Sequence, residues 1–177
     1  LSRLSHVCSR LERRGLVRSC AQQAREGMKV TTASARVLES RRTVVELLLA
    51  SHPEDCLSCL RLGSCELNQV AEQVGVRKRA YPPVRAPRKL DAISAAIVRD
   101  NDKCILCGRC VEVCSEVQGV SAIDYAGRGL GSRVATFGDR SLADSVCVSC
   151  GQCTVVCPTG ALTERDETDE EIGRAHV

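Results

Sequence analysis

Apolar side chains recur near helical period in two stretches of the chain. In the first, apolar pairs alternate with polar positions between Ser34 and Ala50: Val37/Leu38, Val44/Val45 and Leu48/Leu49. This spacing predicts an amphipathic helix with Ser34 as its N-cap. The second stretch follows the cysteine at position 65 and ends at Gly75, which suits a helix C-cap; its apolar positions are Leu67, Val70, Ala71 and Val74. Upstream of both helices, residues 26–32 predict a turn leading into a strand.

The composition limits the size of the hydrophobic core. Of the 177 residues, aromatic residues make up 2%, Trp is absent and Phe137 is the one Phe, so we do not expect a large packed core. The longest apolar run, residues 44–50, is interrupted by Glu46. It is far shorter than the roughly 20 residues that span a bilayer. We therefore expect no transmembrane segment.

Cysteine is the residue type that says most about function. Eleven of the 13 cysteines and one of the 3 histidines fall into three runs: His52-Cys56-Cys59-Cys65, Cys104-Cys107-Cys110-Cys114 and Cys147-Cys150-Cys153-Cys157. The second and third runs have the C-x2-C-x2-C-x3-C spacing of bacterial ferredoxins, and Pro158 completes the pattern on the third. The runs predict three 4Fe-4S clusters and an electron-transfer role. Free thiolates that bind iron indicate a reducing compartment, so we expect a cytoplasmic protein.

The second and third runs are copies of each other. They repeat at a constant offset of 43 residues, from Cys104 to Cys147 and from Cys114 to Cys157. This repeat predicts a pseudo-symmetric ferredoxin fold in which each half contributes a short strand, a ligand loop and a helix that begins at the last cysteine of its run. The loop between the halves is glycine-rich and predicts a surface hairpin or flap.

In two-cluster ferredoxins the fourth cysteine of each run ligates the other cluster. This crossing predicts two ligand sets, each of three cysteines from one run and one from the other. The sets are Cys104, Cys107, Cys110 with Cys157, and Cys147, Cys150, Cys153 with Cys114. The main alternative is a zinc-binding interaction module, because zinc also takes four-cysteine sites built from C-x2-C pairs. Zinc knuckles give two ligands each, whereas these runs give three plus one, so we favour iron-sulfur clusters.

The segment before the repeat is basic and rich in proline. Residues 81–96 follow a cluster of positive charges and hold Pro82, Pro83 and Pro87, which predicts a semi-rigid linker. A basic run can bind nucleic acid, but no aromatic platform accompanies it apart from Tyr81. We expect a solvated linker or charges that compensate the negative clusters, and no nucleic-acid partner.

The first run has a less regular spacing and resembles a specific site. The sequence Ser-His52-Pro-Glu-Asp-Cys56-Leu-Ser-Cys59-Leu-Arg-Leu-Gly-Ser-Cys65 is similar to the 4Fe-4S site with one histidine and three cysteine ligands. That site is shared by FeFe hydrogenases, the large iron-sulfur subunit of NADH dehydrogenase and related formate dehydrogenase subunits. The resemblance implies that His52, Cys56, Cys59 and Cys65 are ligands; the alternative is a surface histidine beside a zinc knuckle.

Within this family, the chain most resembles the relay region of FeFe hydrogenases. Both ferredoxin runs are complete, whereas NADH dehydrogenase large subunits typically keep one cluster there; further matching stretches are Glu116-Val-Gln-Gly-Val, Ser141-Leu-Ala-Asp-Ser and Pro158-Thr-Gly-Ala-Leu-Thr-Glu. The resemblance implies electron transfer between an external carrier, either ferredoxin or NADH through a partner subunit, and a catalytic domain beyond this chain. The alternatives are the relay region of a NAD-dependent formate dehydrogenase and a protein like the large iron-sulfur subunit of NADH:quinone oxidoreductase. No catalytic residues are expected within these residues.

The family also places a plant-type 2Fe-2S domain before the histidine-ligated site. By this resemblance Cys20 and Cys8 are 2Fe-2S ligands in the full-length protein, but Ser5 stands where another cysteine is expected. The last seven residues, 171–177, resemble the translation of a sequencing adapter, and we expect the chain to be a gene fragment.

Together these observations predict an α+β chain of five parts. Residues 1–33 are the truncated remnant of a plant-type 2Fe-2S ferredoxin domain, 34–80 a helical 4Fe-4S domain with one His and three Cys ligands, and 81–96 the linker. Residues 97–163 form a bacterial-type two-cluster ferredoxin-like domain, and 164–177 an acidic link with the adapter-like tail.

Overall fold

The computed structural model describes residues 9–11, 15–19, 22–85, 87–88 and 90–168. The chain divides into two compact units, and each is described by itself. Unit 1 comprises Leu1–His52 and Gly63–Val84, and unit 2 comprises Pro53–Leu62 and Arg85–Val177. The boundary between the units therefore falls twice within the first ligand run. Helices and strands occur in both, as expected for an α+β chain.

Unit 1 begins with a small antiparallel sheet. Its strands are β1 (Ser9–Leu11), β2 (Gly15–Val17) and β3 (Val30–Thr31), in the order β2-β1-β3. The predicted turn and strand at residues 26–32 are confirmed by β3. Cys8 and Cys20, the expected 2Fe-2S ligands, lie outside the described residues.

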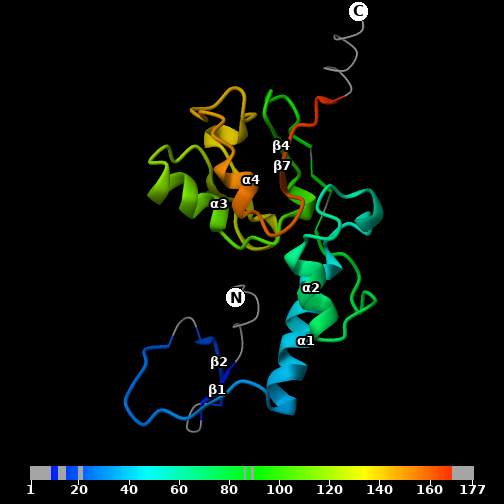
Figure 1. The fold of residues 1–177 in the computed structure, drawn as a ribbon, viewed down its shortest axis with the longest axis vertical. Helices are drawn as coiled ribbons and strands as arrows, with labels where there is room; N and C mark the ends of the chain where they lie inside the picture. The colour runs from blue at the N-terminus through cyan, green and yellow to red at the C-terminus, as the bar shows by residue number, and fades with distance from the viewer. Residues whose placement is uncertain (1–8, 12–14, 20–21, 86, 89, 169–177) are drawn as a thin grey trace, which may run out of the picture. The chain divides into compact units, whose positions relative to one another are not determined.

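Two helices form the rest of unit 1 and lie side by side (Figure 1). Helix α1 (Ala35–Ala50) is capped by Ser34, whose hydroxyl accepts a hydrogen bond from the amide of Val37, as predicted. Helix α2 (Glu66–Gln73) ends in a Schellman motif, because Gly75 has a positive φ and the amide of Val76 donates to the carbonyl of Ala71. The two helices share a small apolar core of Val45, Val70, Ala71 and Val76. Helix α1 thus ends two residues before His52.

Unit 2 is held together by two antiparallel strand pairs and a cysteine-rich core. Strand β4 (Ile97–Arg99) pairs with β7 (Leu162–Glu164), which joins the start of the repeat to its end. Strands β5 (Asp124–Ala126) and β6 (Arg133–Ala135) form a hairpin, so the predicted hairpin in the glycine-rich segment is confirmed. The core between these pairs consists of Ile97, Cys110, Ile123, Val134, Leu142, Cys153 and Leu162. Because cysteines take the places of large apolar residues, this core is arranged around sulfur.

The prediction that each helix of the repeat begins at the last cysteine of its run is wrong. Helix α3 (Arg109–Glu112) begins after Gly108 and continues as a π-helical segment, Val113–Val117; α4 (Gln152–Val156) begins after Gly151. Both glycines have a left-handed backbone that a side chain would strain, so they set the helix starts. Cys157 is extended and ends α4 because the residue before a proline disfavours the helical region. The third cysteine of each run, not the fourth, therefore lies in the first turn of its helix.

Several of the connecting segments form short 3-10 helices. These helices are Cys56–Ser58, Asn101–Lys103, Gly129–Gly131 and Phe137–Asp139. No described helix is long and apolar enough to cross a membrane.

Candidate metal centres

The two ligand loops of the repeat have the same backbone conformation. The second residue after the first cysteine, Leu106 or Ser149, has a positive φ of 58° or 54°. The fourth residue, Gly108 or Gly151, has a φ of 79° or 73°. Positive φ is uncommon for a residue with a side chain, so its recurrence at Leu106 and Ser149 shows that the two loops share a specific backbone shape. The sequence repeat is therefore also a structural repeat.

Four cysteines surround one cavity in unit 2, which we call the Cys157 cavity. Cys104, Cys107 and Cys110 line it from the second run, and Cys157 lines it from the third. The lining also includes Arg99, Asn101 and Pro158. Three thiols of one loop thus share a cavity with the fourth thiol of the other loop.

A second cavity, which we call the Cys114 cavity, has the complementary set. Cys147, Cys150 and Cys153 line it from the third run, and Cys114 lines it from the second. Its remaining walls are largely apolar, from residues such as Ile97, Val120 and Leu142. The structure therefore groups the eight cysteines of the repeat around two cavities, in the same crossed sets that the sequence predicts as ligands.

Backbone amides point at the sulfur atoms in both halves. The amide of Leu106 donates to Sγ of Cys104 and the amide of Ser149 to Sγ of Cys147, each at 3.4 Å. The amide of Ala122 donates to Sγ of Cys114 at 3.3 Å. Such bonds favour thiolate over thiol, and hydrogen bonds to sulfur are one of the factors that set cluster potentials.

Burial holds the innermost thiols in the protonated form. Desolvation, followed by the charge of neighbouring cysteines, raises the pKa of Cys110 to about 12 and that of Cys153 to about 11. A thiol with so high a pKa stays protonated at neutral pH. It loses its proton and becomes a ligand only when a metal cation enters the cavity. Metal binding at these sites would therefore release protons.

A tyrosine closes one side of the first loop. The hydroxyl of Tyr125 donates to the carbonyl of Leu106 at 3.4 Å, and a Cβ at Gly108 would collide with that hydroxyl. Burial and the nearby Cys107 raise the pKa of Tyr125. Gly151, the equivalent glycine of the other half, has open space around it. Gly108 is thus needed both for its backbone angle and for the close approach of Tyr125.

The residues of the first run lie in both units. His52 and Cys65 belong to unit 1, and Cys56 and Cys59 belong to unit 2. His52 is buried, with 8% of its surface exposed, and its carbonyl accepts a hydrogen bond from Arg79. Cys65 is half-buried and precedes the first turn of α2.

Within unit 2, the segment Pro53–Leu62 lies against the end of the repeat. A Cβ at Gly160 would stand 2.8 Å from Sγ of Cys59, which is closer than van der Waals contact allows. Asp55 forms an ion pair with Lys103 at 2.9 Å, and Arg61 donates to the carbonyl of Thr154. Burial opposes the charge on Lys103, but the hydrogen bond and charge of Asp55 outweigh it and the pKa of Lys103 is raised. Cys59 is thereby held against Gly160, which follows Cys157 by three residues along the chain.

The part of the basic linker that belongs to unit 2 contacts the start of the repeat. Arg85 donates to the carbonyl of Cys104 at 3.1 Å, and its charge is among the groups that lower the pKa of that thiol, although burial dominates and the net shift is upward. The amide of Arg88 donates to the carboxylate of Asp102 at 3.0 Å. Both arginines therefore lie against the second ligand run.

Sequence reasoning did not assign Arg99 or Thr159 to a metal centre, although Thr159 lies in a stretch that resembles the hydrogenase relay region. Both residues line the Cys157 cavity, Arg99 from β4 and Thr159 from the turn between α4 and β7. The hydroxyl of Thr159 donates to the carbonyl of Lys103 at 2.8 Å and closes the wall beside Cys157. Among the described residues, no three His, Cys, Asp or Glu side chains converge closely enough to hold a single metal ion. The thiols are instead spread around cavities.

Two families of known proteins match the chain. The NADH-ubiquinone oxidoreductase-G iron-sulfur binding region matches residues 41–80, and the 4Fe-4S dicluster domain matches residues 103–161. The chain is therefore an iron-sulfur electron-transfer protein in which an NADH dehydrogenase-type iron-sulfur region precedes a dicluster domain. It is similar to subunits of hydrogenases and NADH dehydrogenases and to a putative formate dehydrogenase.

Individual relatives support this placement. The chain is 47% identical over 154 residues to the NADP-reducing hydrogenase subunit HndD of Solidesulfovibrio fructosivorans, covering 87% of this chain and 26% of that protein. It is 32% identical over 152 residues to the mitochondrial NADH-ubiquinone oxidoreductase 78 kDa subunit of Candida albicans, covering 85% of this chain and 21% of that protein. Among solved structures, a NAD+-reducing [NiFe]-hydrogenase in the H2-reduced state matches with a TM-score of 0.83 and 28% identity, covering 93% of this chain and 70% of that chain. The chain thus spans about a quarter of the length of the curated relatives or less.

Proposed function

We propose that the chain holds three 4Fe-4S clusters and relays electrons within a larger oxidoreductase. The observation that carries this proposal is the pair of cavities, each walled by three cysteines of one run and the fourth cysteine of the other. A bound 4Fe-4S cluster accepts and releases one electron at a time. The proposed ligand sets are Cys104, Cys107, Cys110 and Cys157; Cys147, Cys150, Cys153 and Cys114; and His52, Cys56, Cys59 and Cys65.

The chain's own residues suit this chemistry. The thiols of Cys110 and Cys153 are buried within the core of unit 2, which limits the reorganisation of water when the charge of a site changes. The amides of Leu106, Ser149 and Ala122 donate to three of the proposed ligands and lower the energy of the more negative state. Crossed ligation holds the two halves of the repeat together at their centre.

The histidine of the first site has a separate role in this proposal. A neutral imidazole in place of a thiolate removes one negative charge and raises the potential of the site, as histidine does in Rieske centres. Within unit 2, the contact of Cys59 with Gly160 supports an electron path that runs from Cys59 past Gly160 toward Cys157.

For the whole protein we propose an FeFe hydrogenase. The resemblance of the chain to hydrogenase relay regions and its 47% identity to a hydrogenase subunit support this assignment. The relay would link an external carrier, ferredoxin or NADH through a partner subunit, to a catalytic domain outside these residues. Relatives that are subunits of NAD(P)-linked enzymes support a partner subunit. The alternatives are a NAD-dependent formate dehydrogenase and a protein like the large iron-sulfur subunit of NADH:quinone oxidoreductase.

Two further parts of the proposal concern the chain's setting. The iron-binding thiols favour a reducing, cytoplasmic location. Cys8 and Cys20 are proposed as ligands of a 2Fe-2S cluster in the full-length protein, on the family resemblance alone.

The test is a metal and sulfide assay on anaerobically purified protein, combined with visible and EPR spectroscopy. We expect brown protein that contains iron and acid-labile sulfide in equal amounts, and EPR signals after reduction with dithionite. Colourless protein with zinc and no sulfide would refute the proposal and favour a zinc-binding interaction module.

A further inference from the structure

A cavity of about 500 Å³ lies beside the Cys157 cavity in unit 2 and has no role in the proposed relay. We call it the arginine pocket, because four arginines line it: Arg88, Arg99, Arg133 and Arg140. Three aspartates also line it, namely Asp91, Asp139 and Asp144. The charged side chains of the lining therefore have a net charge of one positive unit, which favours an anion. Its volume lies in the range of small-molecule sites.

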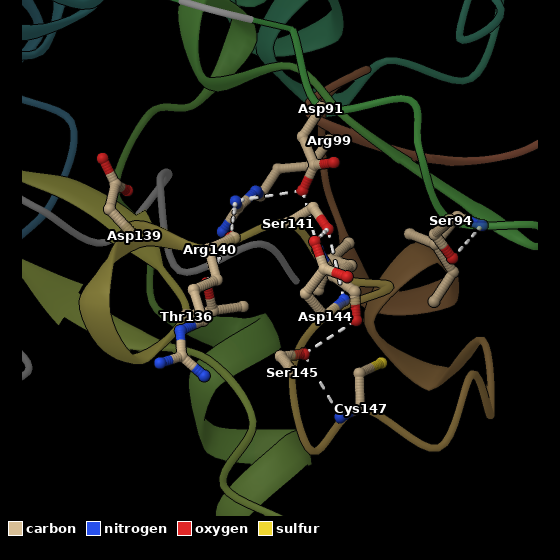
Figure 2. Close-up of polar contacts among 12 residues, drawn as sticks. Asp91, Ser94, Arg99, Thr136, Asp139, Arg140, Ser141, Asp144, Ser145 and Cys147 are labelled. Carbon is tan, nitrogen blue, oxygen red and sulfur yellow. Dashed lines mark hydrogen bonds and ion pairs between the residues drawn. The ribbon is translucent and has the colours of Figure 1, made fainter.

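Arg99 is the deepest of these cations, with 5% of its surface exposed. One nitrogen, Nη2, is fixed by the carboxylate of Asp91 at 3.0 Å and by the carbonyl of Arg140 at 3.1 Å, as Figure 2 shows. Its other two nitrogens, Nε and Nη1, are shielded from solvent and have no hydrogen-bond partner in the described part of the chain. Buried donors of this kind are rare in proteins and call for an acceptor.

Arg88 repeats this arrangement where the linker meets the β5–β6 hairpin. Its Nη2 is fixed by the carbonyls of Leu130 at 3.2 Å and Ser132 at 2.9 Å. Its Nη1 is buried and likewise has no partner among the described residues. Two guanidinium groups are therefore held rigidly by protein acceptors on one side while their remaining donors stay unused.

We propose that the arginine pocket binds a phosphate group, either free or carried by a small hydroxylated molecule. Arg88 and Arg140 line the pocket with no carboxylate on their guanidinium groups among the described contacts, and two guanidinium groups suit the several acceptor oxygens of a phosphate. The charge of Arg99 reaches this pocket: Arg133 chiefly, and Arg99 in addition, lower the pKa of Asp139. Oδ1 of Asp91 is a buried acceptor without a partner in the described chain, which suits a hydroxyl group on the same ligand.

The aspartates do not cancel the attraction. Asp91 is already bound through Oδ2 to Arg99 and to the amide of Leu142, which donates at 2.9 Å. Asp139 is engaged by Arg133 in a two-point ion pair, and Asp144 accepts a hydrogen bond from the hydroxyl of Ser141 at 2.7 Å. Arg88 and Arg140 have no carboxylate on their guanidinium groups among the described contacts, so their charges are left for an anion.

The experiment is calorimetric titration of the cluster-loaded chain with two probes, inorganic phosphate and ribose 5-phosphate, in chloride buffer. We expect saturable one-to-one binding. Arg88→Gln removes the Nη1 donor and the charge and should weaken binding at least about tenfold. The matched control is Arg128→Gln, because Arg128 is exposed on the same hairpin and does not line the pocket; its affinity should equal that of the unchanged chain.

The two probes separate the sources of the phosphate. Tighter binding of ribose 5-phosphate supports a hydroxylated ligand read by Asp91, and equal binding supports a site for the free anion. If Arg88→Gln does not fold, Arg140→Gln removes an exposed cation of the lining and should weaken binding a few-fold. Absence of saturation by both probes, or equal weakening by the Arg128 control, would overturn the proposal.

Discussion

Replacing Gly160 by alanine tests whether the segment Pro53–Leu62, which carries Cys59, is fixed against the end of the repeat within unit 2. The added Cβ would lie 2.8 Å from Sγ of Cys59 and 3.3 Å from Cδ of Lys103, whereas favourable contacts lie at roughly 3.5–4.0 Å. Overpacking of this kind costs about 1–3 kcal/mol. Reduced freedom of the unfolded chain offsets about 0.4–1 kcal/mol, which leaves a net destabilisation of about 0–2.6 kcal/mol, with a midpoint of about 1.3 kcal/mol. Because Cys59 must move, we also expect poor assembly of the histidine-ligated cluster.

The chain offers a matched control for this substitution. A Cβ at Gly131 would meet no atom within 4 Å, and the backbone there is not in the left-handed region. Gly131→Ala should therefore be neutral or stabilising by up to about 1 kcal/mol. The measurements are urea unfolding midpoints by circular dichroism, and iron content with EPR of the reduced proteins. If Gly160→Ala matched Gly131→Ala in both midpoint and iron content, the proposed contact of Cys59 would be refuted.

Three further predictions concern the ligands and one ion pair. Crossed ligation requires that the EPR spectrum of Cys157→Ser resemble that of Cys107→Ser and not that of Cys150→Ser; the opposite pairing would show uncrossed ligation. His52→Ala should alter one cluster signal and leave the other two, and an unchanged spectrum would exclude His52 as a ligand. Asp139→Asn should cost below about 1 kcal/mol because the pair with Arg133 is half-exposed. Arg133 lowers the pKa of Asp139. The stabilisation by this ion pair should therefore be present above the ordinary carboxyl pKa of about 3.9 and disappear as the pH falls through the lower pKa of the folded chain. Urea unfolding at pH 7 and pH 2 measures the cost of Asp139→Asn, and a cost that persists at pH 2 would contradict the prediction.

Local signals in the sequence predicted the parts of the fold that depend on neighbours along the chain. Ser34 caps α1 and Gly75 ends α2 because both act within one helical turn. The spacing of the cysteines likewise determines the loop shape, since Gly108 and Gly151 follow each C-x2-C pair directly. The helix starts in the repeat were predicted wrongly, because the left-handed glycines favour earlier starts and Pro158 disfavours a helix at Cys157.

Contacts between residues that meet only in three dimensions could not be predicted from the sequence. Gly160 lies in a stretch that resembles the hydrogenase relay region, but nothing in that stretch indicates its contact with Cys59, and Arg99 is one of 25 basic residues. The boundaries of the compact units show the same limit: the segment Pro53–Leu62 is assigned to the unit of the repeat, although the ligand run of which it is part begins at His52. The spacing of the ligands along the sequence therefore does not determine which compact unit each ligand packs into.

Arg99 connects the proposed phosphate site with the proposed cluster site, because it lines both the arginine pocket and the Cys157 cavity. A buried positive charge stabilises the reduced, more negative form of a nearby cluster and raises its potential. Phosphate bound at Arg88 and Arg99 would offset that charge and lower the potential again. Redox titration monitored by EPR should therefore show a negative shift for the cluster of Cys104, Cys107, Cys110 and Cys157 when phosphate is added, and a smaller shift for the cluster in the Cys114 cavity, whose lining lacks Arg99. The shift should disappear in Arg88→Gln and persist in Arg128→Gln. Equal shifts for both clusters would mean that phosphate acts through ionic strength and not through Arg99.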